Sequence, residues 1–154
     1  MKKLIFILIA AIAISCNSNN KIKEQEADFL GEENHSLMSQ LPEAPRWILD
    51  NENIFNADEL NQLQSIADSM FSTTGNMCMI QTIETYKPFN SLNEYAQAID
   101  ANWHDDSQKY IIIILSTSLV EVRIINGDML EKAIPNSFTD YVIQQVMIPE
   151  LHNL

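Results

Sequence analysis

The hydrophobic pattern of the chain changes twice along its length. Residues 4–14 form an unbroken apolar run, whereas residues 17–45 are polar and show no apolar periodicity. From residue 46 onward, short apolar runs alternate with segments whose apolar residues recur every three or four positions. That alternation is typical of strands connected by amphipathic helices. We therefore expect a signal segment over 1–15, a flexible tether over 16–45 and one α/β domain over 46–154.

Four apolar runs predict the strands of this domain, at 47–49, 77–83, 110–115 and 119–125. The third run is apolar at every position, which indicates a central strand covered on both faces. We expect the second run to pair with it in parallel, through a right-handed crossover. The fourth run should return antiparallel as a hairpin, with apolar side chains on one face and charged side chains on the other.

Three further segments have helical spacing. The first begins after Asn56, where Glu59 completes a capping box, and ends at Gly75. Its expected buried face consists of Leu60, Leu63, Ile66, Ala67 and Met70. The other two helices are expected over about 92–103 and from about 137 to a stop at Pro149. Strands and helices together predict a small three-layer α/β sandwich with a mixed, mostly parallel sheet flanked by helices.

The start of the chain predicts a lipid anchor. Lys2 and Lys3 are positive, the apolar run follows, and the small Ser15 precedes Cys16. The run is too short to span a bilayer, which takes about 20 apolar residues. The segment 13–16, Ala-Ile-Ser-Cys, resembles the lipobox of bacterial lipoproteins, in which the signal peptide is removed and the cysteine is lipidated. We expect acyl chains such as palmitate at Cys16; an ordinary secretory signal followed by an incidental cysteine is the alternative.

A lipidated Cys16 would hold the domain at a membrane without a membrane-spanning helix. Asn17 follows it, where an aspartate would retain a lipoprotein in the inner membrane. We therefore expect a lipid-anchored protein of the cell envelope, at the outer membrane or the periplasmic face. The tether would reach roughly 95 Å when fully extended.

The net charge limits the partners. The whole chain carries a formal charge of −12, and removal of residues 1–15 takes away two lysines and no acid, which leaves −14. This charge repels nucleic acid, so we expect no nucleic-acid partner, and it favours divalent cations or basic protein surfaces. The second cysteine, Cys78, lies in an apolar run, which predicts a buried small residue and not a reactive thiol.

Acidic residues converge at one edge of the expected sheet. Asp105 and Asp106 precede the central strand, and Asp128 and Glu131 follow the antiparallel strand that ends at the same edge. Carboxylate oxygens suit Ca²⁺ or Mg²⁺, and no paired cysteines indicate zinc. We take Asp105, Asp106 and Asp128 as candidate metal ligands. The alternative is a solvated acidic rim on an acidic protein, and by the same topology Asp50 lies at the opposite edge, where it organises the connection to the first helix.

Five segments within residues 46–150 resemble, in their order and spacing, those of a known family. They are Ile48-Leu49-Asp50, the helix start Ser91-Leu92-Asn93-Glu94-Tyr95-Ala96 with Trp103, the strand 110–115, Glu121-Val122-Arg123-Ile124, and Ile148-Pro149-Glu150-Leu151. The family is the TPM domain of bacterial envelope and plant thylakoid proteins. The resemblance implies the same α/β fold and, by analogy with similar domains, divalent-cation binding or the phosphatase activity of plant members.

Two function classes fit these features. The first is an accessory or binding lipoprotein that docks to another envelope protein, with a bound cation at its acidic edge. The second is a weak metal-dependent phosphatase in which the same carboxylates hold the cation. The sequence contains no Gly-rich phosphate loop, nucleophile elbow or zinc-protease motif, and no basic cluster accompanies the acids. We therefore favour the docking module and assign no catalytic residue.

Overall fold

The computed structural model describes residues 36–103 and 109–152. The expected lipidation site Cys16 and two of the expected metal ligands, Asp105 and Asp106, lie outside the described residues. Residues 41–154 form one compact unit, which contains the expected α/β domain. Within the described ranges no helix is long and apolar enough to cross a membrane.

A four-stranded sheet with the order β1-β2-β3-β4 forms the middle layer of this unit. Its strands are β1 (Ile48–Asp50), β2 (Met77–Thr82), β3 (Tyr110–Ser116) and β4 (Glu121–Asn126). The first three run parallel, and β4 pairs antiparallel with β3. The expected mixed, mostly parallel sheet is confirmed, with each strand within two residues of its expected start.

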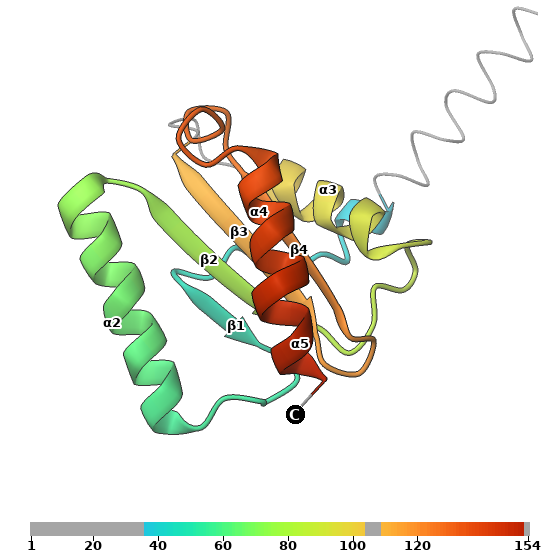
Figure 1. Cartoon of the computed structure of the whole chain (residues 1–154). Helices are drawn as coiled ribbons and strands as arrows, with labels where there is room; N and C mark the ends of the chain where they lie inside the picture. Colours follow the sequence, from blue (N-terminus) through green and yellow to red (C-terminus); the bar gives the residue numbers. More distant parts are fainter. Residues whose placement is uncertain (1–35, 104–108, 153–154) are drawn as a thin grey trace, which may run out of the picture. The chain divides into compact units, whose positions relative to one another are not determined.

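Helices cover both faces of the sheet (Figure 1). One face carries α2 (Ala57–Thr74) and α3 (Leu92–Trp103). The other carries a C-terminal helical run made of α4 (Asn136–Val142), a π-helical turn η1 (Ile143–Met147) and α5 (Ile148–Leu151). The two crossovers β1-α2-β2 and β2-α3-β3 advance in the same direction across the sheet, and crossovers of one hand then leave their helices on the same face.

Alternation along the strands supplies apolar side chains to both layers. In β3, Ile112 and Ile114 are fully buried and share the face that α3 covers, where Tyr95 of α3 accepts a 2.8 Å hydrogen bond from Gln81 of β2. Leu115 points to the opposite face and packs against the C-terminal helical run, near Ile143. The central strand is therefore covered on both faces, as its continuous apolar run predicts.

The local signals at α2 act as expected. The side chain of Asn56 accepts hydrogen bonds from the backbone N–H groups of Asp58 and Glu59, and the Glu59 carboxylate accepts from the N–H of Asn56. This reciprocal capping box fixes the start of the helix. Gly75 ends it in the left-handed conformation, with φ of 72°, which glycine adopts without a Cβ clash.

The buried face of α2 differs from the expected one at Ile66. Ala67 is 3% exposed and lies at the centre of the packed face, whereas Ile66 is 66% exposed. Adjacent residues on a helix are about 100° apart, so a face centred on Ala67 turns Ile66 toward solvent. The expectation that Ile66 belongs to the core was wrong.

The expected stop at Pro149 was also wrong, because the helical run continues to Leu151. Proline lacks an N–H and its ring crowds the carbonyl four residues earlier, which would end a regular helix. Here the preceding turn is π-helical, and the N–H of Ile148 bonds to the carbonyl of Ile143, five residues back. The wider turn accommodates the proline ring.

Asp50 holds together the connection between β1 and α2. Its carboxylate accepts hydrogen bonds from the backbone N–H groups of Ile54 and Phe55, at 3.2 and 3.1 Å, and from the Thr82 hydroxyl at 2.7 Å. Thr82 is fully buried at the end of β2. One side chain thus joins the ends of two strands to the loop before α2, which is the organising role expected for it.

We predict that Asp50→Ala lowers the free energy of unfolding by about 2–4 kcal/mol, because it leaves two amide groups and a buried hydroxyl without their acceptor. Urea denaturation of the full chain measures this change. Asp140→Ala, a loss of the same charge on the exposed surface of α4, is the matched control and should change stability by less than about 0.5 kcal/mol. Equal effects of the two substitutions would contradict a structural role for Asp50.

Candidate functional site

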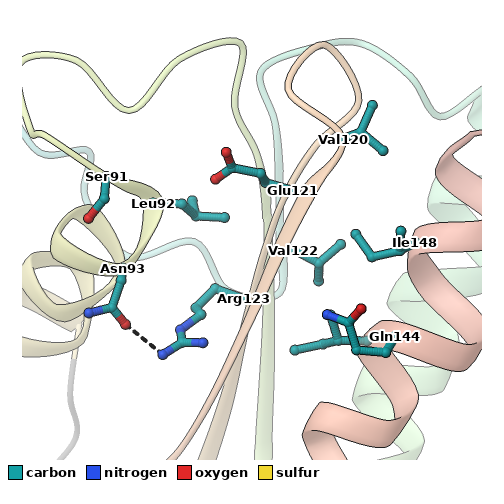
Figure 2. A pocket seen from close by; sticks show the side chains of 10 residues that line it. Ser91, Leu92, Asn93, Val120, Glu121, Val122, Arg123, Gln144 and Ile148 are labelled. Atoms are coloured by element: carbon teal, nitrogen blue, oxygen red, sulfur yellow. Dashed lines mark hydrogen bonds between the residues drawn. The ribbon is translucent and has the colours of Figure 1, made fainter.

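A groove of about 480 Å³ runs along the outer edge of β4. Ten residues line it: Ser91, Leu92, Asn93, Val120, Glu121, Val122, Arg123, Ile143, Gln144 and Ile148. Figure 2 shows the N-terminal turn of α3 on one side of the strand and the C-terminal helical run on the other. The groove is therefore built from three elements that are distant in sequence, and β4 lies between its two walls.

The two walls differ in chemistry. On the side of α3, Ser91 and Asn93 face Glu121 and Arg123, and the Arg123 guanidinium donates a 2.6 Å hydrogen bond to the amide oxygen of Asn93 (Figure 2). On the other side the lining is mainly apolar, with Val122, Ile143 and Ile148 beside Gln144. The alternation of β4 side chains causes this difference, because neighbouring residues of a strand point to opposite faces of the sheet.

The backbone of β4 presents hydrogen-bonding groups to the groove. The N–H of Gly127 donates to the carbonyl of Tyr110, which fixes the alternation of the antiparallel ladder. By that alternation the backbone N–H and C=O groups of Glu121 and Arg123 bond to β3. The backbone N–H and C=O groups of Val122 and Ile124 point away from β3. Val122 is 8% exposed and forms part of the floor of the groove.

The expected acidic edge is present in part. Asp128 follows β4 at the edge where β3 begins, as the topology predicts, and it lines a smaller depression of about 240 Å³ together with Asp100 and Glu131. The carboxylate of Asp100 already accepts a 2.8 Å hydrogen bond from the Tyr110 hydroxyl. Within 36–103 and 109–152, no three His, Cys, Asp or Glu side chains gather closely enough to hold a metal ion.

The opposite edge of the sheet, at the carboxyl ends of the parallel strands, is closed by internal hydrogen bonds. The Glu52 carboxylate accepts from the backbone N–H and the hydroxyl of Thr117, at 3.1 and 3.0 Å, and from the Ser118 hydroxyl. Ligands of open α/β sheets usually bind at this edge. In this domain the polar groups of Glu52, Thr117 and Ser118 bond to one another. No motif in the sequence indicates that Glu52 reaches the turn after β3.

Burial raises two pKa values inside the domain. The thiol of Cys78 on β2 has a raised pKa because desolvation disfavours the thiolate. Desolvation likewise raises the pKa of Tyr95, and the hydrogen bond from Gln81 partly opposes this shift. Cys78 is half-buried and not fully buried as expected, but a weakly ionised thiol is a poor nucleophile, in agreement with the expected lack of reactivity.

Comparison with known proteins decides the family. The family model of the TPM domain, labelled TPM phosphatase, matches residues 48–153. The chain belongs to the TPM domain family. The resemblance expected over residues 46–150 is therefore confirmed, although no functionally curated protein matches the chain.

Solved structures of low sequence identity share the fold of this TPM domain. The N-terminal domain of a protein from P. gingivalis matches with a TM-score of 0.62 at 13% identity, over 71% of this chain and 71% of that chain. The N-terminal domain of the cg2496 protein from Corynebacterium glutamicum matches with a TM-score of 0.53 at 14% identity, over 73% of this chain and 75% of that one. Both comparisons support the fold alone.

We predict that iodoacetamide alkylates Cys78 at least about tenfold more slowly in the folded protein than in concentrated urea near neutral pH, because the thiolate is the reacting form. The measurement uses Cys16→Ser, in which Cys78 is the remaining thiol. Since its pKa is raised on folding, Cys78 contributes stability below the unfolded pKa of about 9, and this contribution is lost as pH rises through the folded pKa. Equal alkylation rates in the folded protein and in concentrated urea would contradict the raised pKa of Cys78.

Proposed function

We propose that this protein is a lipid-anchored envelope lipoprotein whose TPM domain is an accessory module that docks to another envelope protein. Lipidation of Cys16 would anchor it, at the outer membrane or the periplasmic face, and the polar tether would let the domain reach a partner. The acidic chain, with a formal charge of −12, favours a basic partner surface and disfavours nucleic acid.

The observation that carries the docking function is the groove along β4. It combines apolar side chains, polar side chains and outward-facing backbone groups, which is the composition of a protein-binding surface. Its ten lining residues include no histidine, cysteine or lysine, so general acid–base or nucleophilic catalysis has few candidate groups there. These properties favour binding over chemistry at this site.

A divalent cation is the proposed ligand of the acidic edge. Asp128 would share Ca²⁺ or Mg²⁺ with Asp105 and Asp106, which precede β3 in the sequence. The second candidate function, a weak metal-dependent phosphatase, would use the same three carboxylates. The acidic depression beside Asp128 and the label of the family model favour it, whereas the acidity of the chain opposes an anionic substrate.

Crosslinking in intact cells tests the anchor and the docking together. We predict that the full chain fractionates with membranes and that an amine-reactive crosslinker yields one adduct of defined mass. Cys16→Ser should move the protein to the soluble fraction and reduce that adduct several-fold, because the anchor confines the domain and raises its local concentration near the partner. A Cys16→Ser variant that stays with the membranes would refute the lipid anchor, and a smear of adducts without a defined species would refute specific docking.

Calorimetric titration tests the cation site. We predict saturable binding of Ca²⁺ or Mg²⁺ to the full chain, and its loss in Asp105→Ala/Asp128→Ala. Asp140→Ala/Glu150→Ala removes the same charge from exposed positions of the C-terminal helical run and should leave binding unchanged. A lack of binding at millimolar cation would exclude both the site and the phosphatase. Cation-dependent hydrolysis of a generic phosphate ester that Asp105→Ala abolishes would establish the phosphatase instead.

A further inference from the structure

Among the residues that the structure describes, the outer edge of β4 is the longer of the two unpaired edges of the sheet. The other edge strand, β1, has three residues, whereas β4 has six. An exposed edge offers a row of backbone groups to any other strand, and proteins usually shorten, charge or cover it. The charged residues of β4, Glu121 and Arg123, lie on one face of the strand, and the apolar Val122 and Ile124 leave the other face without this protection.

We infer that the groove receives an extended segment of the partner protein, which pairs with β4 as a fifth strand of the sheet. The inference rests on the proposed docking function and specifies how docking occurs. The outward N–H and C=O groups of Val122 and Ile124 recur at two-residue spacing, about 7 Å apart. An extended polypeptide matches this spacing with alternating donors and acceptors of its own, as in known cases of strand addition.

The walls of the groove determine which side chains the added strand carries. Residues directly opposite Val122 and Ile124 point toward the apolar wall formed by Ile143 and Ile148, so these positions should be apolar. Residues between them point toward the N-terminal turn of α3, Glu121 and Arg123, whose guanidinium already bonds to Asn93, so these positions should be polar. The acidity of the chain favours lysine or arginine among them. The expected occupant is a segment in which apolar and basic residues alternate.

A second copy of this chain fits the groove less well. Both α3 and the η1 turn pack directly over β4. If β4 paired with its own counterpart, the helices over each strand would be separated by the strand spacing of about 4.8 Å, whereas packed helices need 8–10 Å between their axes. Two copies would also bring together two formal charges of −12. A single strand from another protein avoids both conflicts.

Amide hydrogen exchange, measured by NMR on the full chain in mild detergent, tests this inference with a synthetic peptide of four Lys-Val repeats. We expect saturable binding that slows exchange at Val122 and Ile124 by about tenfold or more. Exchange at Arg123, whose N–H already bonds to β3, should not change. No slowing at either edge amide with millimolar peptide would overturn the inference, as would slowing that accompanies a doubling of the protein mass, which would assign the edge to a second copy.

N-methylated peptides provide the matched controls. We expect the peptide to pair antiparallel with β4, which turns the valine N–H groups toward β4 and the lysine N–H groups away from it. Methylation of the valine nitrogens should therefore abolish protection, whereas methylation of the lysine nitrogens should retain it. Equal protection by the two methylated peptides would show that the peptide does not pair as a strand, and would overturn the inference.

Site-specific photocrosslinking in cells separates this inference from the proposed function. A photoreactive residue replaces Gln144, in the groove, or Ile66, which is exposed on α2. The expected result is an adduct with the same partner from position 144 and none from position 66. An adduct from position 66 alone would overturn strand addition and leave docking intact. The lack of an adduct from position 144 would overturn strand addition, and the same lack together with no defined adduct from the amine-reactive crosslinker would overturn the docking function itself.

Discussion

The burial of β3 between two helical layers is the constraint on which the rest of the structure depends. Ile112 and Ile114 are fully buried beneath α3, and Leu115 is buried beneath the C-terminal helical run. Full burial of each such side chain contributes about 1.5–3 kcal/mol. A strand covered on both faces needs neighbours on both sides to satisfy its backbone, and β2 and β4 take those positions. The position of β4 at the edge follows from this requirement.

The same arrangement creates the groove. The helix α3 and the turn η1 pack on opposite faces of β4, because they cover the two faces of the sheet there. They therefore form a wall on either side of this outermost strand (Figure 2). The backbone groups of Val122 lie at the floor between these walls, and those of Ile124 follow along the same edge, beside the smaller depression. Packing of the core thus leaves a narrow and two-sided opening, in which only a thin, extended occupant can pair with the strand.

Much of the fold could be predicted because its signals are local. The capping box of Asn56 and Glu59, the left-handed Gly75 and the continuous apolar run of β3 each depend on a few neighbouring residues. The errors had non-local causes. Ile66 has the spacing of a core residue, but spacing alone does not fix which side of a helical stripe faces the sheet. Pro149 would end a regular helix, but a π-helical turn continues this one.

The candidate site could be predicted only in part. The position of Asp128 at the edge where β3 begins follows from the order and direction of the strands. The groove unites Ser91, Arg123 and Gln144, which share no motif and lie far apart in the sequence, so no pattern could have indicated it. The hydrogen bonds of Glu52 to Thr117 and Ser118 likewise span about 65 residues.

By itself, the sequence determined the order of helices and strands, the parallel core of the sheet, the family resemblance and the expectation of a lipid anchor, because periodicity, caps and short motifs act over a few residues. The tertiary structure alone decided which strand remains at the edge, which side chains form the walls beside it and which acids already serve as internal acceptors. These properties depend on how distant segments pack around β3, and sequence spacing does not specify that packing.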